Sequence, residues 1–322
     1  MDATPAHGRL LETIGRYFPA LDLSVDRGLA EELGTRMVDF AHRHRLADRE
    51  TLAHLGKTAC NSIYFIAAYP DASKENQQLI CDIFMWFAAF DDIHAERIDS
   101  TAADSVARHT FALLEALDGT LTESAPGFET ALADILRRAQ AWDPRQQGNL
   151  RNALHGVLLG WQWEAQLRNT GGQPSLQTYL YARRHSIAAV LERAIAEPMS
   201  GHVLPDVQRN DPELVRLNRA FSNLSGWVND LFSYEGEKRR DGQLSVNLPN
   251  VLMREQGCSL SDAIARISEM IVGEAEVAAR SLQSLSASPS PEVRAYVRGT
   301  ERVLRLHTAL FVVSGFGRYI EG

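Results

Sequence analysis

The stretch NDLFSYEGE, residues 229–237, places three polar side chains at helical spacing. Asn229, Ser233 and Glu237 recur at every fourth position, so a helix through this stretch carries all three on one face. An amide oxygen, a hydroxyl and a carboxylate are hard ligands of the kind that Mg²⁺ prefers, whereas softer metals favour Cys and His. The stretch therefore predicts a helix with a magnesium-binding face, and a diphosphate is the ligand that such a face suggests.

Polar residues at this spacing more often form the solvated stripe of an amphipathic helix. In this segment, however, apolar side chains such as Phe221, Trp227 and Phe232 crowd the helix and leave little width for a solvated face. The composition of the segment therefore favours the metal-binding interpretation.

A second acidic cluster follows the run IFMWFAAF, residues 83–90, which is apolar at every position and predicts a buried helix or a cavity wall. Asp91 and Asp92 emerge directly from this run, and Glu96 comes one turn after Asp92. These carboxylates repel one another unless a divalent cation neutralises them. The alternative is that the helix ends before them and the acids enter solvent. We expect His94, between the acids, to be exposed and not to bind metal.

The distribution of proline, glycine and apolar residues along the chain predicts an all-α fold. Prolines and glycines cluster in short segments, and between them apolar residues recur at three- and four-residue spacing with no long alternating stretch. No break is long or polar enough for a hinge, so we expect one domain over residues 1–322, built as an antiparallel helical bundle. The expected breaks are 70–71, 118–127, 171–174, 201–212, 241–249 and 286–291.

The composition limits which binding partners and which cellular compartment we expect. A net charge of −8 speaks against nucleic acid, whose phosphates are bound by basic surfaces. Cys60, Cys81 and Cys258 are too few and too scattered for a metal or disulfide framework, so we expect reduced packing residues. Neither a signal region nor an apolar run long enough to span a bilayer is evident. We expect a cytoplasmic protein without stable membrane insertion, either a monomer or a homodimer.

The two acidic motifs together resemble the metal-binding motifs of the microbial class I terpene synthases. Further landmarks of that family occur in its order and at its approximate spacing, so the resemblance spans residues 69 to 319. It implies the all-α class I terpenoid synthase fold, an isoprenyl diphosphate substrate and Mg²⁺, with three ions when substrate is bound. The further landmarks are Tyr69-Pro70-Asp71-Ala72, Trp86, Trp163-Glu164, Pro174-Ser175, Tyr179-Leu180, Arg183 and Arg318-Tyr319.

The resemblance also assigns roles to individual residues. Arg183 lies 46 positions before Asn229, where the family carries the arginine that senses the diphosphate, although the adjacent Arg184 leaves the register uncertain by one. Catalytic roles are implied for Arg183, Arg318 and Tyr319. The implied metal ligands are Asp91, Asp92, Glu96, Asn229, Ser233 and Glu237, and the implied diphosphate contacts are Arg183, Arg240, Lys238, Arg318 and Tyr319.

A carbocation needs a dry cavity with inert aromatic walls. Phe87 and Phe84 lie about one and two turns before Asp91, and Phe65 can face them from the preceding helix. The chain departs from the family at three positions. It has Val312 where many members have Trp, Ala88 where they have a second aromatic residue, and Ile187 where they have Gly at a helix break.

The function that these features imply is that of a lyase acting on a carbon–oxygen bond of a phosphate ester. It ionises a linear isoprenyl diphosphate and releases a cyclic terpene hydrocarbon or alcohol. Farnesyl diphosphate is the expected substrate, followed by geranylgeranyl and then geranyl diphosphate. One alternative is an isoprenyl diphosphate synthase, which normally has a second aspartate-rich motif that this chain lacks. The other alternative is a non-catalytic helical metal-binding scaffold.

Overall fold

The computed structural model describes most of the chain, and all of its regular structure is helical. The described residues are 4–48, 51, 63–95, 102–121, 126–241 and 246–314, without the side chains of 4–7, 102, 240–241 and 312–314. Within these residues no strand occurs, which confirms the predicted all-α fold. The prediction of one domain over residues 1–322 stays a prediction.

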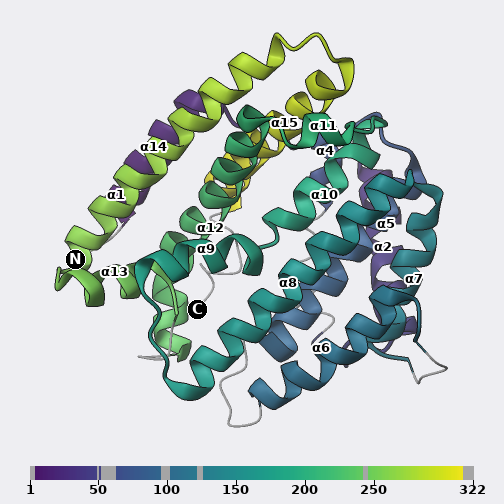
Figure 1. Ribbon diagram of the computed structural model, residues 1–322, viewed down its shortest axis with the longest axis horizontal. Helices are drawn as coiled ribbons and strands as arrows, with labels where there is room; N and C mark the ends of the chain where they lie inside the picture. Colours follow the sequence, from purple (N-terminus) through teal and green to yellow (C-terminus); the bar gives the residue numbers. More distant parts are fainter. Residues whose placement is uncertain are drawn as a thin grey trace.

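The helices of the described chain form a bundle, which Figure 1 shows with long helices crossing its whole length. Their bounds are α1 (Thr4–Tyr17), α2 (Arg27–Arg43), α4 (Phe65–Ala68), α5 (Lys74–Phe90), α6 (Ala102–Asp118), α7 (Phe128–Arg138), α8 (Pro144–Thr170), α9 (Leu176–Ser186), α10 (Ala189–Ser200), α11 (Asp206–Arg209), α12 (Pro212–Asp241), α13 (Leu248–Gln256), α14 (Leu260–Ser286) and α15 (Pro291–Ser314). A π-helical turn, η2 (Asp91–Ala95), continues α5, and a 3₁₀ turn, η3 (Ala139–Ala141), follows α7.

Each of the six expected breaks separates two helices, and further breaks that were not expected lie at residues 18–26, 142–143, 187–188 and 257–259. At several helix ends, residues with suitable side chains or backbone conformations satisfy the exposed backbone groups. The side chain of Ser175 accepts a hydrogen bond from the backbone N–H of Thr178 and so caps the start of α9. Gly171 and Gly201 end α8 and α10 with φ of 62° and 68°, a conformation that glycine adopts without steric cost. Local chemistry therefore sets these boundaries.

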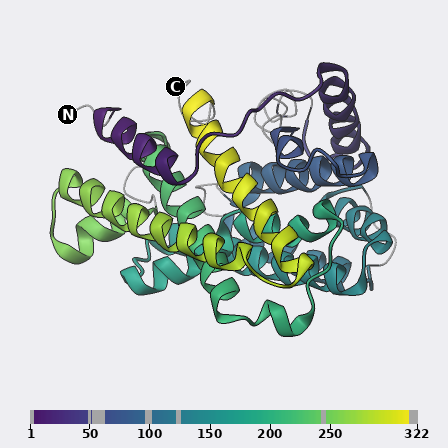
Figure 2. The same ribbon diagram turned by 90° about the horizontal axis from the view of Figure 1, so that it is seen from above.

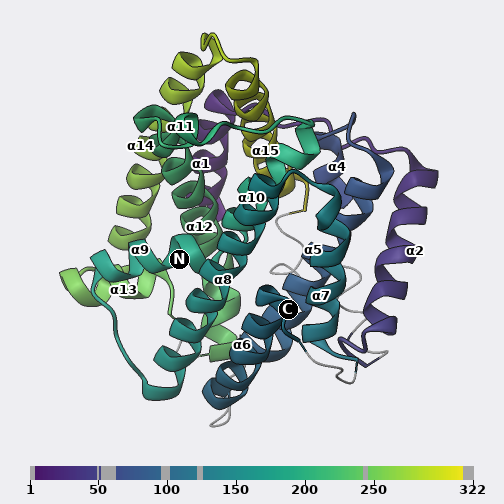
Figure 3. The same ribbon diagram turned by 45° about the vertical axis from the view of Figure 1, so that its right-hand side comes forward.

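The two acidic motifs lie on neighbouring parts of the bundle. α12 packs against α14, α9 and α10, and α14 lies with α1 at one side of the molecule (Figures 1 and 2). On the other side, α5 packs against α2 and α7, as Figure 3 shows. α8 contacts both halves, because it packs against α9 and α10 and also against α6 and η2. Together with α9 and α10, it connects η2 to α12.

Buried apolar side chains from α1 through α15 form one contiguous core. The run 83–90 is buried in α5 as predicted, with only Phe87 and Ala88 half-buried. Trp86 is fully buried, and its indole N–H donates to the carbonyl of Phe128 at 3.0 Å, so its one polar group is satisfied. No helix in the described ranges is both long and apolar enough to cross a membrane.

Candidate active site

Arg183, in the last turn of α9, reaches the middle of α12. Its Nε donates to Asp230 Oδ1 at 2.9 Å and its Nη2 to Asn229 Oδ1 at 2.8 Å. Nη1 donates to Ser186 Oγ at 3.3 Å, within its own turn. The neighbouring Arg184 instead donates from Nε to Asn223 Oδ1 at 2.8 Å, farther from the polar motif. The structure thus brings Arg183, and not Arg184, to the predicted metal-binding face.

Asp230 holds this arginine in a dry environment. Its side chain is 1% exposed, and burial raises the pKa of this carboxyl to about 6, although Arg183 lowers it. Tyr179 donates its hydroxyl to Asp230 Oδ2 at 2.7 Å. For Arg183, burial lowers the guanidinium pKa, but Asp230 and other nearby groups outweigh burial and raise it well above its usual value. The guanidinium is therefore a fixed charge at this place.

Two residues of α8 continue the polar network towards the aspartate-rich segment. Glu164 is buried, and its carboxylate accepts from Arg183 Nη1 at 3.5 Å and from Arg168 Nη2 at 3.1 Å. Arg168 also donates from Nη1 to the carbonyl of Ala95, the last residue of η2, at 2.5 Å. An unbroken chain of contacts therefore joins η2 through α8 and α9 to Asn229 on α12.

The aspartate-rich segment leaves α5 through one turn of π-helix, a distortion that is often found at functional sites. Asp91 and Asp92 are half-buried there. Trp161 of α8 donates its indole N–H to Asp91 Oδ1 at 3.0 Å. The indole is itself held between aromatic rings, with centroid distances of 4.6 Å to Phe90 and 4.9 Å to Phe87. The orientation of Asp91 is thus set by the aromatic core.

Ser233 and Glu237 continue the face of α12 that begins at Asn229. Ser233 is 0% exposed, and its Oγ has no hydrogen-bond partner in the described part of the chain. A buried hydroxyl oxygen without a partner is costly, and a bound cation satisfies it. Glu237 Oε2 accepts from Asn247 Nδ2 at 3.0 Å, which orients the third oxygen ligand. The donor set and the unsatisfied hydroxyl both fit a hard divalent cation.

Histidine, cysteine and acidic side chains do not by themselves form a metal-binding group of three within the described ranges. The predicted ligands are instead divided between two segments and include the amide of Asn229 and the hydroxyl of Ser233. Glu96, Arg318 and Tyr319 lie outside the described residues, as does the side chain of Arg240. Lys238 is exposed, with its ammonium 5.5 Å from the centre of the Tyr234 ring.

The predicted aromatic residues lie in the core beside this network. The rings of Phe65 and Phe84 stack at a centroid distance of 4.7 Å, and Phe87 contacts Trp161. His307 of α15 contacts Phe65 edge-on at 6.4 Å and lies with Nε2 3.2 Å from a carboxylate oxygen of Glu192. Phe65 and Phe84 thus belong to one group of contacting rings, which also includes His307 of the His307–Glu192 pair. Phe87 belongs to another group, with Trp161.

His94 was expected to be exposed, and that expectation is wrong. The side chain is half-buried, because α6 packs against η2 and covers it. Its Nδ1 lies 3.2 Å from Ser105 Oγ, and its ring lies 4.4 Å from that of His109.

The helix break after Arg183 is present although the family's glycine is replaced by Ile187. α9 ends at Ser186, Ile187 is extended with φ −88° and ψ 147°, and α10 begins two residues later. Gly160 of α8 lies against the break, since a Cβ there would come within 2.6 Å of the backbone nitrogen of Ser186. Gly226 of α12 likewise lies against Arg183, since a Cβ there would come within 3.1 Å of the Arg183 Cγ.

Four residues that the sequence did not single out as functional complete the network: Trp161, Arg168, Asp230 and Asn247. The available signals were weak. Asp230 stands inside the stretch 229–237 but between its ligand positions, and Gly160 and Gly226 interrupt helical patterns in a way that marks close packing.

Comparison with known proteins gives consistent matches. The family described as "Terpene synthase family 2, C-terminal metal binding" matches residues 82–276. The chain is 34% identical over 228 residues to (12E)-labda-8(17),12,14-triene synthase of Streptomyces anulatus, covering 69% of this chain and 70% of that protein. It is 32% identical over 237 residues to 4-epi-cubebol synthase ((2E,6E)-farnesyl diphosphate cyclizing) of Streptosporangium roseum, covering 72% and 71%.

A solved structure shares the fold over almost the whole chain. It is 2-methylisoborneol synthase from Streptomyces coelicolor A3(2) in complex with Mg²⁺ and 2-fluoroneryl diphosphate. The two chains superpose with a TM-score of 0.78 at 20% identity, covering 90% of this chain and 92% of the other.

Proposed function

Because this chain belongs to the bacterial class I terpene synthases, we propose that it ionises farnesyl diphosphate in the presence of Mg²⁺ and cyclises the resulting cation to a terpene. The contact chain from Ala95 through Arg168, Glu164 and Arg183 to Asn229 carries the proposal. It supports one site shared by two segments that lie more than a hundred residues apart in the sequence.

We assign the metal to Asp91, Asp92 and Glu96 on one side and to Asn229, Ser233 and Glu237 on the other, with three ions in the substrate complex. Bound Mg²⁺ supplies charge stabilisation for the diphosphate leaving group. The amide oxygen of Asn229 has two lone pairs, so it can accept from Arg183 and bind a cation at the same time.

Arg183 is the residue of this chain to which we assign diphosphate binding during ionisation. Asp230 and Glu164 fix its guanidinium before substrate arrives, so little reorganisation is needed when negative charge develops on the leaving group. Lys238, Arg240, Arg318 and Tyr319 are assigned further contacts with the diphosphate. The cation itself then requires walls without nucleophiles, a role that we assign to Phe65, Phe84 and Phe87.

The relatives support two substrate lengths. The Streptosporangium roseum protein is named for cyclising (2E,6E)-farnesyl diphosphate. The Streptomyces anulatus protein is named for a labdatriene, whose skeleton has twenty carbons, and this favours geranylgeranyl length as the second candidate.

The test is incubation of the purified protein and Mg²⁺ with geranyl, farnesyl and geranylgeranyl diphosphate, followed by gas chromatography with mass detection. A bicyclic labdane-type diphosphate completes the panel. We expect a cyclic product from farnesyl diphosphate, and release of diphosphate that requires Mg²⁺. Turnover of the twenty-carbon substrates alone would replace the proposed substrate. If no substrate releases diphosphate, the scaffold alternative is favoured. If a longer prenyl diphosphate forms when isopentenyl diphosphate is added to the incubation, the isoprenyl diphosphate synthase is favoured.

A further inference from the structure

A polar cavity lies at the opposite end of α8 and α12 from the proposed metal-binding motifs. Its volume is about 280 Å³, and residues of α8, α10, α12 and α15 line it. Asn218, in its wall, precedes Asn229 by 11 residues of α12, which corresponds to about 17 Å at 1.5 Å per residue. The exposed Asn152 is also part of the lining, so solvent reaches the cavity. This cavity is therefore separate from the candidate active site.

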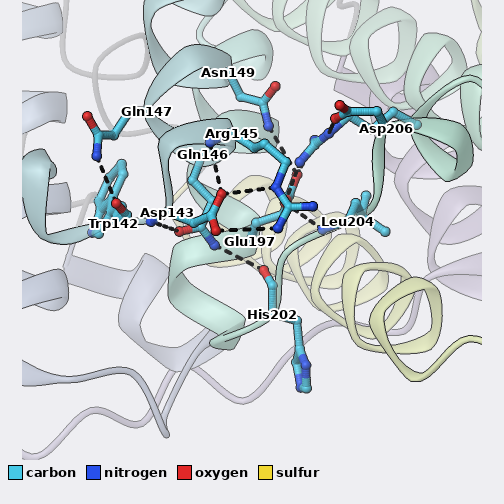
Figure 4. Close-up of polar contacts among 11 residues, drawn as sticks. Trp142, Asp143, Arg145, Gln146, Gln147, Asn149, Glu197, His202, Leu204 and Asp206 are labelled. Carbon is cyan, nitrogen blue, oxygen red and sulfur yellow. Dashed lines mark hydrogen bonds and ion pairs between the residues drawn. The ribbon is translucent and has the colours of Figure 1, made fainter.

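The ion pair between Glu197 and Arg209 forms one wall of the cavity, and the hydrogen bonds of its carboxylate are all made within the protein. Glu197 is buried, and its two carboxylate oxygens are bridged by the guanidinium of Arg209, with Nη2 2.7 Å from Oε2. The backbone N–H of Leu204 donates to the same carboxylate at 2.9 Å and Asn149 Nδ2 at 3.3 Å, as the close-up in Figure 4 shows for this cluster. Because Glu197 is neutralised and fully hydrogen-bonded, it adds little repulsion towards an anion in the cavity.

Arg193 faces the same cavity without such a partner. No hydrogen bond or ion pair of its guanidinium occurs among the described residues, and its Nε is buried and unsatisfied. Burial lowers the pKa of Arg193, and the neighbouring Tyr296 and Glu192 oppose this shift only in part. The adjacent Glu192 is directed elsewhere, since its carboxylate pairs with His307. Of the three charged side chains that line the cavity, Arg193, Arg209 and Glu197, Arg193 is the one without a hydrogen-bonded or ion-paired partner among the described residues.

Neutral donors stand beside Arg193. Tyr296 donates its hydroxyl to Asn218 Oδ1 at 2.8 Å, which leaves the amide nitrogen of Asn218 as a donor. Burial, followed by the neighbouring Arg193 and Arg184, lowers the pKa of His185, so the imidazole is neutral near pH 7 and offers one N–H. Both side chains line the cavity.

We propose that this cavity binds a compact phosphate-type oxyanion, inorganic phosphate or diphosphate, with Arg193 as its charge partner and Asn218 and His185 as neutral donors. An arginine fork matches two oxygens of such an anion, and the pairing offsets the cost of the half-buried, unpaired guanidinium. The cavity volume suits an anion of this size and does not suit a prenyl chain in addition. The proposal does not depend on the catalytic assignment, because no metal takes part.

Isothermal titration calorimetry with phosphate and, separately, diphosphate tests the proposal, with the full chain in EDTA. We expect one saturable site, at least a tenfold loss of affinity in Arg193→Gln, and unchanged affinity in Arg183→Gln. The same anion should raise the melting temperature of the unmodified protein and not that of Arg193→Gln. A folded Arg193→Gln protein is expected, since the substitution removes a half-buried, unpaired charge; its melting curve without anion checks this.

Any one of the following outcomes would overturn the proposal. They are the absence of saturable binding by the unmodified protein, equal affinity in Arg193→Gln, and loss of binding in Arg183→Gln, which would place the anion in the candidate active site. Citrate, a carboxylate anion, is titrated in the same experiment for comparison. Tighter binding of citrate than of either phosphate would reject the phosphate class. If Arg193→Gln does not fold, Asn218→Ala replaces it, with a weaker but measurable loss of affinity expected.

Discussion

Arg183 and Arg184 are adjacent in the sequence but contact different residues of α12. The sequence left the register open by one residue, but neighbouring residues of a helix point about 100° apart. Arg183 therefore reaches Asn229 and Asp230, whereas Arg184 reaches Asn223, whose amide nitrogen in turn donates to Glu274 at 2.8 Å. Spacing along the chain could not separate the two, because the difference lies in which neighbouring side chains each one meets.

This difference predicts unequal effects of the same substitution. Arg183→Lys should lower kcat by about a hundredfold or more, because a preorganised donor to the leaving group is lost. Arg184→Lys, the matched control, should change kcat less than threefold. Steady-state release of diphosphate from the best substrate measures both. Equal losses in the two variants would contradict the assignment of Arg183.

The raised pKa of Asp230, about 6, predicts a pH dependence of stability in the metal-free protein. An unfolded Asp titrates near pH 4, so between about pH 4 and 6 the folded chain holds a proton that the unfolded chain has released. Raising the pH through this window therefore favours unfolding through this group. The unfolding free energy of the unmodified protein, relative to that of Asp230→Asn, should fall from pH 4 to 6 in urea titrations with EDTA. A constant or rising difference would show that the carboxyl titrates normally.

The helix boundaries were largely predictable, whereas the break at Ile187 was not. The breaks at residues 171–174 and 286–291 follow from glycine and proline, whose backbone preferences act locally. Ile187 has no such preference, and its extended backbone stands where α8 comes close at Gly160. The sequence could not reveal this because the close contact is formed by a helix that precedes it by some 25 residues.

Two glycines of α8 provide a matched test of that contact. Gly160→Ala puts a Cβ 2.6 Å from the backbone of Ser186 and should destabilise the protein by about 1–3 kcal/mol, the usual cost of overpacking. Gly148→Ala meets nothing within 4 Å and should stabilise it by about 0.5–1 kcal/mol through helix propensity. Urea denaturation of the three proteins measures both values. A neutral Gly160→Ala would mean that α8 does not constrain the break.

Across the whole molecule, the all-α fold was predicted, and the two segments proposed to bind metal were singled out, while the residues that join these segments were missed. Trp161 and Arg168 looked like ordinary helix residues, because their partners Asp91 and Ala95 lie some 70 residues away. Glu164 was noted only as a family landmark. Long-range pairing of this kind follows from how α8 packs between α9 and η2, which periodicity along one chain does not contain.

The buried position of Glu164 between two arginines predicts that its substitution strongly lowers the stability of the protein. Glu164→Gln removes the buried carboxylate that pairs with Arg168 and with one side of Arg183, and we expect a loss of about 3 kcal/mol in unfolding free energy. Glu276→Gln removes the carboxylate of an exposed pair with Arg280 and should cost less than about 1 kcal/mol. Denaturant titrations distinguish the two. Similar small losses would mean that Glu164 does not hold the halves of the site together.

A crystal structure with Mg²⁺ and inorganic diphosphate tests the shared site most directly. We expect metal ions between the two segments, bound by Asp91 on one side and by Asn229, Ser233 and Glu237 on the other, with Arg183 on the diphosphate. Ions bound to only one segment, with Arg183 still directed away from the diphosphate, would contradict it.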